Sequence, residues 1–455
     1  MKISLHGACR EVTGSCVLIE TEKTKFLFDC GMFQGEDYAD NKNLDDFNFN
    51  PKEIDFVFLS HAHIDHCGRL PKLYRDGFRG KVYCTEPTLD LTALMLDDSV
   101  GIITSEAQER GHEPLFTLED VSGLINLLEP LEYGREYKIN DEIKIKLGNS
   151  GHILGSAFFE VWIKEGSKKE KKIVYSGDLG KAPARIIKDP EIVAGADLVF
   201  IESTYARDTH ETKEEGRAII KQAIVDCIRN KGTLIIPVFA MEKSQEILYE
   251  LNHMAENGEI PRVKMFLDSP LAIRATEIYR KYKNLYDEES KKILLKDDDL
   301  FDFPGMEFTL SRDDSMKINV TNPPKVILAG GGMCVGGRIQ HHLKFNLAEE
   351  NTHVLLVAYQ AKGTLGRKLM KGFEYVDIHG DSIPVRAKVS VVNSYSAHAD
   401  RDALISWLKA IKAPTPKKVF IVHGAESSGL DFQEDAGKEL ESEFILPEYG
   451  KLYEF

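Results

Sequence analysis

Apolar positions in the first part of the chain form short runs that end in polar residues. Residues 25–31 (KFLFDCG) and 54–61 (IDFVFLSH) follow this pattern, and residues 144–164 and 171–180 repeat it. Runs of this length predict β-strands, whereas residues 91–110 carry the spacing of an amphipathic helix. The first region is therefore expected to consist mostly of strands, with a few helices.

The pattern changes near residue 206, where apolar strands begin to alternate with helices. Residues 214–230 and 243–256 read as helices, and residues 233–239 and 325–332 read as strands. This alternation predicts a parallel sheet covered on both faces. Later residues return to strands around one helix. The predicted organisation is a first domain part at 1–205, an inserted domain at 206–372 and a return segment at 373–455.

Composition fits an ordinary soluble protein of two domains. The chain has 455 residues, of which 42% are hydrophobic and 29% are charged. Its seven cysteines are scattered and form no CxxC pair, which favours a reducing, cytoplasmic location over a disulfide framework. The start of the sequence lacks the apolar core of a signal peptide, and no run reaches membrane-spanning length. We expect no membrane partner.

The net charge of −15, from 58 basic and 73 acidic residues, weighs against a protein that coats nucleic acid. It does not exclude a nuclease, because bound metal cations and a few arginines can make one cleft positive.

Residues 60–68 read SHAHIDHCG and follow a hydrophobic strand. Alternation along this loop places His61, His63 and Asp65 toward one side, with His66 next to them. A lone histidine is usually a satisfied surface or core side chain, but four such groups in six residues are hard to pack without a cation. The segment therefore predicts a metal site. Imidazole and carboxylate ligands favour zinc, with manganese and iron as alternatives.

Three more ligand-type residues follow strands later in the chain. They are His152 in GNSGHILGS, Asp178 in YSGDLG and His423 in VFIVHGAES. In this order, the HxHxDH cluster with a distant His, a distant Asp and a late His resembles the metallo-β-lactamase superfamily. The resemblance implies an α/β fold in which helices sandwich two β-sheets (αββα), with a dinuclear metal site at one edge.

The resemblance also assigns the ligands. One metal would be held by His61, His63 and His152. The other would be held by Asp65, His66 and His423. Asp178 would bridge the two metals, and Asp29, at the end of KFLFDCG, would orient ligands by hydrogen bonds.

Further motifs resemble the β-CASP branch of this superfamily, whose members process nucleic acids and carry an inserted α/β domain. They are ESTY at 202–205, FAMEKSQEIL at 239–248, DSPLA at 268–272, GGGMCVGGRIQHHL at 330–343, YQAKGTLGRKL at 359–369 and SAHAD at 396–400. Within the branch, the chain resembles bacterial and archaeal RNA-cleaving members akin to the eukaryotic pre-mRNA 3′-end endonuclease. The branch's acidic and histidine motifs map to Glu202, His398 and His423. DNA-directed members typically lack the last histidine, so the resemblance favours RNA. One departure is Lys243, where many members carry Arg.

Phosphodiester hydrolysis needs an activated water and a proton for the leaving oxygen. Two metals can activate the water and bind phosphate oxygens, with Asp178 orienting the water. His398, held by Glu202, is the expected general acid. A purely structural hydrogen bond for His398 and a strand-end cap for Glu202 are the alternatives.

Other residues are expected to contact RNA phosphates. Glycines let backbone N–H groups approach an anion, and basic or hydroxyl side chains add donors. A tight turn at the glycine loop and solvated charges elsewhere are the alternatives, and His341 and His342 are expected to be helix-surface residues. The predicted phosphate contacts are Gly336, Gly337, Arg338, Lys362, Arg367, Ser394 and Ser396.

The sequence thus predicts a zinc-dependent ribonuclease with two zinc ions, acting on single-stranded RNA as an endonuclease and in some settings as an exonuclease, with a homodimer as one form of assembly. The alternative is a small-molecule hydrolase of lactonase or thioesterase type on the same metal core. A non-catalytic RNA scaffold is a third interpretation. The inserted region favours the nuclease over the small-molecule enzyme, and the intact ligand set disfavours the scaffold.

Overall fold

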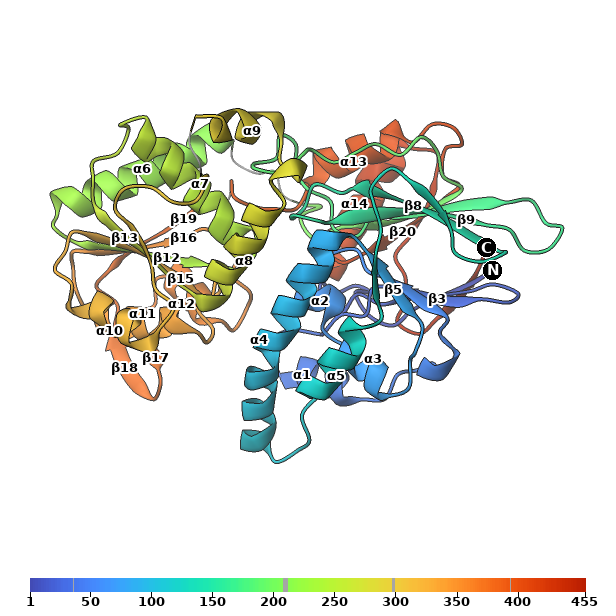
Figure 1. Ribbon diagram of the computed structural model, residues 1–455, viewed down its shortest axis with the longest axis horizontal. Coiled ribbons are helices and arrows are strands. Elements are labelled where there is room, and N and C mark those ends of the chain that lie inside the picture. Colours follow the sequence, from blue (N-terminus) through green and yellow to red (C-terminus); the bar gives the residue numbers. More distant parts are fainter. Residues whose placement is uncertain (36, 208–211, 297–298, 393) are drawn as a thin grey trace. The chain divides into compact units, whose positions relative to one another are not determined.

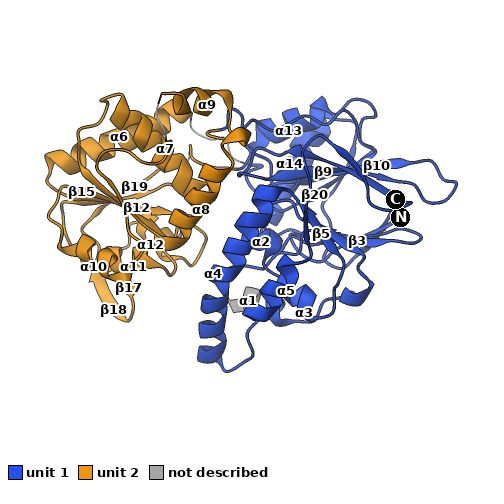
Figure 2. Ribbon diagram, viewed as in Figure 1, with its two compact units in different colours: residues 1–184, 188–209, 398–455 blue, residues 185–187, 210–397 orange. Residues whose placement is uncertain are grey.

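The computed structural model describes residues 1–455 except 36, 208–211, 297–298 and 393. Its chain forms two compact units (Figure 2). Unit 1 comprises residues 1–184, 188–209 and 398–455. Unit 2 comprises residues 185–187 and 210–397.

Unit 2 is thus an insertion in unit 1, but its later boundary differs from the expected one. The chain returns to unit 1 at residue 398 rather than 373. The reason is that strand β19 (Lys388–Val391) pairs in parallel with β16 (Thr352–Leu356) and completes the sheet of unit 2.

Unit 1 contains two seven-stranded sheets (Figure 1). The first has the order β22-β1-β2-β3-β4-β5-β6. Its strands are β1 (Lys2–Leu5), β2 (Val17–Glu20), β3 (Lys25–Phe28), β4 (Phe56–Phe58), β5 (Lys81–Cys84), β6 (Leu128–Pro130) and β22 (Leu452–Glu454). The second has the order β21-β20-β11-β10-β9-β8-β7. Its strands are β7 (Glu136–Lys138), β8 (Ile143–Asn149), β9 (Ala157–Ile163), β10 (Lys171–Tyr175), β11 (Leu198–Glu202), β20 (Lys418–Val422) and β21 (Glu443–Ile445).

The two sheets pack face to face through a core of apolar side chains from both. Alternating residues of β8, for example, point into this core. Aromatic rings join the sheets: Phe28 stacks on Tyr175 with ring centroids 4.6 Å apart, and Phe58 stacks on Phe159 at 5.2 Å. Stacked aromatic pairs add to the stabilisation from burial alone.

Helices cover the outer face of each sheet. A second apolar cluster joins the first sheet to the helices α3 (Leu70–Arg75), α4 (Glu86–Arg110) and α5 (Leu118–Ile125). A third joins the second sheet to α13 (Arg401–Ala410) and α14 (Glu426–Glu439). The layers are therefore αββα, as predicted. Shorter elements of this unit are α1 (Asp37–Leu44), η1 (Pro51–Glu53) and α2 (Ile64–Cys67).

Unit 2 is built on a six-stranded sheet of order β14-β13-β15-β12-β16-β19, in which every pairing is parallel. The other strands of this sheet are β12 (Thr233–Val238), β13 (Lys264–Asp268), β14 (Met306–Phe308) and β15 (Lys325–Gly330). A hairpin follows, with strands β17 (Tyr375–Ile378) and β18 (Asp381–Pro384). The helices are α6 (Lys213–Arg229), α7 (Lys243–Glu256), α8 (Pro270–Lys281), η2 (Lys283–Leu285), α9 (Glu288–Leu294), α10 (Arg312–Val320), α11 (Arg338–Asn346) and α12 (Leu365–Met370).

All carboxyl ends of this parallel sheet meet at one edge, so the loops after its strands gather there. All seven cysteines of the chain are buried and unlinked. Across the described residues, no helix combines the length and apolarity needed to cross a membrane.

Candidate metal centre

The histidine cluster lies where strand β4 ends. His61 and His63 occupy the loop after β4, and His63 is the residue at which helix α2 begins. Neighbouring backbone fixes this turn, because Ser15 N–H donates to Asp65 O at 2.9 Å. Gly31 makes the close approach possible, since a Cβ there would lie 1.5 Å from Asp65 O. The backbone of the HAHIDH segment is therefore held in place by its neighbours at residues 15 and 31.

Four further side chains that the sequence analysis singled out lie at strand ends of the second sheet. His152 comes after β8, Asp178 after β10, and His423 after β20, whereas Glu202 is the last residue of β11. Strands β8, β10, β11 and β20 run in the same direction, because β9 is antiparallel to both of its neighbours. Their carboxyl ends consequently share one edge of the sandwich.

One group of ligand atoms consists of three imidazoles and Asp178. The Nδ1 of His63 lies 3.1 Å from the Nε2 of His61 and 3.1 Å from the Nε2 of His152. Asp178 Oδ2 is 3.4 Å from His61 Nε2 and 3.5 Å from His152 Nε2. All four ligand atoms lie within 4.8 Å of one another. They face one common point.

A second group consists of Asp65, His66 and His423, which meet the other oxygen of Asp178. Asp178 Oδ1 is 3.3 Å from His66 Nε2 and 3.4 Å from His423 Nε2. His423 Nε2 is also 3.4 Å from Asp65 Oδ2. Asp178 thus presents one oxygen to each group.

Two of these polar atoms are buried without a hydrogen-bond partner among the described residues. They are Asp178 Oδ1 and His423 Nε2. Leaving buried polar atoms unsatisfied is costly unless another group binds them. Three imidazole nitrogens converging on a carboxylate oxygen are a donor set that suits zinc. The residues present therefore fit a bound metal.

Burial and charge set the protonation of the first group. Burial, followed by repulsion from His66, holds the pKa of His61 well below its usual value. Burial also lowers the pKa of His63 to about 4, despite the nearby carboxylates. Burial raises the pKa of Asp178, but the surrounding imidazoles, His423 foremost, outweigh it and hold that pKa well below the usual range. These groups are the neutral imidazoles and ionised carboxylate that a metal requires.

Asp29 supports the histidine cluster through hydrogen bonds. Its Oδ2 accepts hydrogen bonds from the Nδ1 of His66 and the hydroxyl of Tyr175, both at 2.7 Å. Its Oδ1 accepts from Ser60 N–H at 2.7 Å. Ser60 also contacts His61 Nδ1 through its hydroxyl at 3.0 Å. Asp29 thereby fixes the His66 ring with Nε2 toward Asp178.

Glu202 and His398 form a pair beside the first group. Glu202 is fully buried, and its Oε1 accepts from Leu179 N–H at 2.9 Å and lies 3.0 Å from His398 Nδ1. His398 Nδ1 is 3.8 Å from Asp178 Oδ2. Burial lowers the pKa of His398, but the Glu202 carboxylate outweighs it and raises that pKa to about 9. Asp178, Glu202 and His398 also meet the geometric requirement for a ligand set.

The other predicted residues lie in unit 2, and the side chains of two of them point into its interior. Arg338 donates to Asp268 at 2.6 Å and to the carbonyls of Thr309 and Leu310 at 2.9 and 2.7 Å. Ser394 is buried against α6, where a Cβ at Gly216 would lie 1.7 Å from its hydroxyl. The guanidinium of Arg338 is therefore bound within the protein, whereas the buried hydroxyl of Ser394 has no hydrogen-bond partner among the described residues.

The remaining predicted contacts lie on loops or surfaces. Gly336 and Gly337 have φ values of 68° and 72°, which favour glycine. Lys362 is exposed, whereas Arg367 and Ser396 are partly exposed.

His342 is not the helix-surface residue that the sequence predicted. It is fully buried, with Nε2 2.7 Å from Asp268 Oδ2 and Nδ1 3.0 Å from Asn319 Oδ1. It lies on the inner face of α11, while its neighbour His341 is exposed. Together with Arg338, it pins the loop after β15 to the end of β13.

Two site residues were missed from the sequence. Ser60 precedes His61, and Thr204 lies within ESTY, where its hydroxyl is 3.0 Å from His423 Nδ1. Their places inside these motifs were the available signal.

Family models match most of the chain. A metallo-beta-lactamase superfamily domain matches residues 18–197, a Beta-Casp domain matches residues 244–369, and a Zn-dependent metallo-hydrolase RNA specificity domain matches residues 382–447.

Several proteins are similar over nearly the whole chain. A ribonuclease of Thermus thermophilus is 37% identical over 430 residues, which cover 94% of each chain. An RNase J-like protein of Methanocaldococcus jannaschii is 32% identical and covers 99% of each chain. The transcription termination factor FttA of the same organism is 32% identical over 98% of this chain and 70% of its own. A crystal structure of an Enterococcus faecalis protein of unknown function shares the fold, with a TM-score of 0.57, 14% identity and 99% coverage of both chains.

Proposed function

Because this chain belongs to the β-CASP branch of the metallo-β-lactamase superfamily, we propose that it is a metal-dependent ribonuclease that hydrolyses phosphodiester bonds of single-stranded RNA at a dinuclear zinc site. The observation that carries the proposal is the pair of ligand groups sharing Asp178, with His398 and Glu202 beside them. His398 and Glu202, here called the acid pair, suit a reaction whose leaving oxygen needs a proton. The names of two relatives, a ribonuclease and an RNase J-like protein, support RNA as the substrate.

The ligands in this proposal follow the two groups. The first zinc ion would be held by His61, His63 and His152. The second would be held by Asp65, His66 and His423. Asp178 would contribute to both ligand groups, and Asp29 would orient His66. Two zinc ions supply Lewis-acid chemistry that polarises the phosphate and provides a nucleophile at neutral pH.

The side chains of this protein carry the proton transfers. Asp178 accepts a hydrogen bond from the attacking water and aligns it with the phosphorus atom. His398 donates a proton to the leaving oxygen from Nε2, the ring nitrogen remote from Glu202. Glu202 keeps His398 in the charged form needed for this step.

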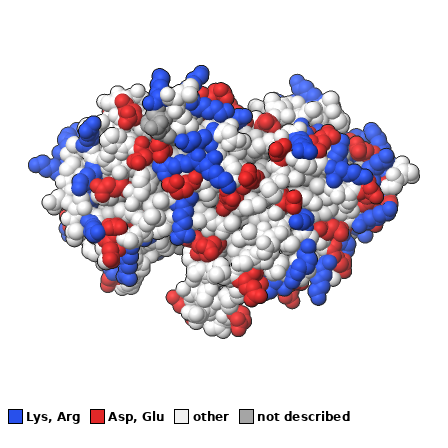
Figure 3. Space-filling model, viewed as in Figure 1, with Lys and Arg blue, Asp and Glu red and all other residues white. Residues whose placement is uncertain are grey.

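The mixed charge on the surface suits a substrate that is bound at one restricted site rather than along a broad basic face. The face in Figure 3 mixes Lys and Arg with Asp and Glu, so no field of one sign covers it. We assign phosphate contacts to the loops at the carboxyl edge of unit 2. They comprise Gly336, Gly337, Lys362 and Arg367, with Ser396 after β19, whereas Ser394 is buried and is not assigned a contact. Arg338 acts by fixing the loop, since its guanidinium is bound to Asp268.

Two aromatic residues at this edge suit unpaired bases. Phe239 follows β12 and Tyr359 follows the neighbouring strand β16, and they are 38% and 62% exposed. Unpaired bases stack on aromatic rings with about 1–3 kcal/mol per base. We therefore expect Phe239→Ala and Tyr359→Ala each to weaken binding of single-stranded RNA by roughly 5- to 150-fold. Fluorescence anisotropy with a labelled oligonucleotide at fixed salt, on an inactive Asp178→Asn background, measures this.

Phe345→Ala is the matched control, because Phe345 is a 66% exposed aromatic residue on the last turn of α11, away from the loops after the strands. Unchanged affinity in both loop variants, or an equal loss in the control, would count against the stacking surface.

Single-strand specificity is tested with zinc-loaded protein on end-labelled RNA. Each base-pair step that must open costs about 1.4 kcal/mol, so each slows cleavage about tenfold. We expect unstructured RNA to be cleaved much faster than a blunt duplex or DNA of the same sequence. Labels at the 5′ and 3′ ends separate internal cleavage from trimming, and chelator-stripped protein is the control. Equal rates on duplex and single strand would refute the proposal.

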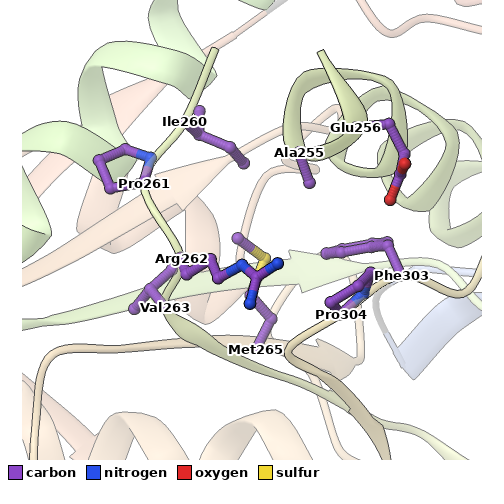
Figure 4. A pocket seen from close by; sticks show the side chains of 9 residues that line it. All are labelled: Ala255, Glu256, Ile260, Pro261, Arg262, Val263, Met265, Phe303 and Pro304. Atoms are coloured by element: carbon purple, nitrogen blue, oxygen red, sulfur yellow. The ribbon is translucent and has the colours of Figure 1, made fainter. Parts of the chain in front are cut away.

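The alternative, a small-molecule hydrolase, has less support. A pocket in unit 2 is lined by Ile260, Arg262, Met265, Phe303 and neighbouring residues (Figure 4). These residues precede or begin β13 and precede β14, so the pocket is at the amino edge of the sheet, and none of its lining residues is a ligand-type residue of the metal centre. Hydrolysis of a lactone or thioester by protein that leaves RNA intact would establish this alternative instead.

A further inference from the structure

The hydroxyl of Thr204 lies between the ring and the backbone of His423. Its Oγ1 is 3.0 Å from His423 Nδ1 and 3.0 Å from the carbonyl oxygen of His423. The two residues are close because β11 and β20 are parallel neighbours with Glu202 opposite Val422. Thr204 and His423 both follow these paired strand ends.

We infer that Thr204 is a positioning residue, which holds the His423 imidazole in the tautomer that presents a bare Nε2 to a metal. A hydroxyl has one proton, and a carbonyl oxygen only accepts. The Thr204 proton therefore goes to the His423 carbonyl, and the contact with the ring must be Nδ1–H donating to Oγ1. With its proton on Nδ1, the ring directs the lone pair of Nε2 toward Asp65 and Asp178, which lie 3.4 Å away.

The backbone of His423 needs the same support. His423 has a φ of 50°, a left-handed conformation that costs about 1–3 kcal/mol for a residue other than glycine. Three hydrogen bonds hold it: its N–H donates to Ala8 O at 2.9 Å, and its carbonyl accepts from Ser203 N–H at 3.2 Å and from Thr204. The ring is therefore aimed by a fixed backbone and by one hydroxyl.

Two other histidines of the cluster are held in the same way, whereas His63 directs its Nδ1 inward. His66 uses Nδ1 to contact Asp29 and His61 uses Nδ1 to contact Ser60, so each of these rings also directs Nε2 inward. Hydrogen bonds of this kind fix the tautomer of metal-binding histidines, and their loss typically costs 10- to 100-fold in metal affinity.

The side chain and backbone of Thr204 have separate tasks, which makes the inference testable. The backbone N–H donates to Glu202 Oε2 at 3.2 Å. Thr204→Val keeps this N–H and the shape of the side chain but removes the hydroxyl, whereas Thr204→Ser keeps the hydroxyl. The contact between Glu202 and His398 is left in place by both changes.

The experiment titrates zinc into stripped protein against a chromophoric chelator. We expect Thr204→Ser to bind two equivalents of zinc with the same affinities as wild type. We expect Thr204→Val to bind one equivalent normally and the other about 10- to 100-fold more weakly. Thr321→Val is the control, because Thr321 also donates to a backbone carbonyl, that of Lys317, but lies in unit 2.

The inference rests on the proposed zinc site, but different experimental results would refute the zinc site and the role of Thr204. Wild type that binds no zinc would refute the metal site itself. Wild type that binds zinc together with Thr204→Val of unchanged affinity would refute only the role of Thr204. If Thr204→Val does not fold by circular dichroism, nitrogen-15 spectra of zinc-loaded wild type decide. A proton on His423 Nδ1 supports the inference, and a proton on Nε2 overturns it.

Discussion

Asp178→Ala is expected to abolish metal retention and to slow RNA cleavage severely. Asp178 supplies one oxygen to each ligand group, so its loss removes a ligand from both at once. The variant also brings buried imidazoles together without their carboxylate. Metal ions contribute several kcal/mol to the transition state of such reactions, so we expect cleavage to fall by about 10³- to 10⁴-fold. Elemental analysis and single-turnover cleavage of labelled RNA measure the two effects.

Asp141→Ala is the matched control for this change, because Asp141 is an almost fully exposed carboxylate whose partner is Lys138. It should retain metal and activity. His63→Ala should lose metal as Asp178→Ala does, since His63 Nδ1 contacts two other imidazoles. An Asp178→Ala protein that keeps two metals and cleaves at the wild-type rate would show that the cluster is not the reaction centre.

The second large effect is expected for His398→Ala, which should slow RNA cleavage by about 10²- to 10⁴-fold while both metals remain bound. His398 contacts Glu202 more closely than Asp178, at 3.0 Å against 3.8 Å, and on this ground we assign the ring to the acid pair rather than to a ligand group. A nitrophenyl phosphodiester has a leaving group that needs little protonation, so its hydrolysis should slow much less than that of RNA.

Glu202→Gln tests the pair. It should act in the same direction as His398→Ala, and the double variant should cost little more than the worse single change, because the two residues act as a unit. Loss of one metal in the His398 variant, with the activated substrate slowed as much as RNA, would make His398 a ligand and reverse the assignment.

The fold class could be predicted from the sequence because it depends on local patterns. Strand-length apolar runs in residues 25–31 and 54–61, and the alternation after residue 206, follow directly from the periodicity of side chains. The αββα sandwich and the inserted parallel sheet confirm those expectations. The residue at which unit 2 ends was harder to predict. Strand β19 joins unit 2 through pairing with β16, and the local sequence pattern does not encode that pairing.

The ligand-type residues were recognisable because they follow strands and the order of their motifs is distinctive. The contacts of other residues depend on distant chain segments. Thr204 meets a ring that is 219 residues away in sequence, and Arg338 meets Asp268, which is 70 residues away. Likewise, His342 reads as a surface residue until the inner face of its helix is known. Long-range partners of single polar residues leave no trace in local composition.

The order of the ligands along the chain has a consequence during translation. Unit 2, apart from residues 185–187, is one continuous stretch that ends at residue 397, whereas His398 and His423 are both made after it. Until β20 is made, β11 has no partner on that side, and the second ligand group and the acid pair are incomplete. A chain that ends within the insert thus contains His61, His63, His152 and Asp178 but lacks both His398 and His423. In the proposed mechanism such a fragment has neither the general acid nor a complete second ligand group, so we expect truncated chains to be inactive on RNA.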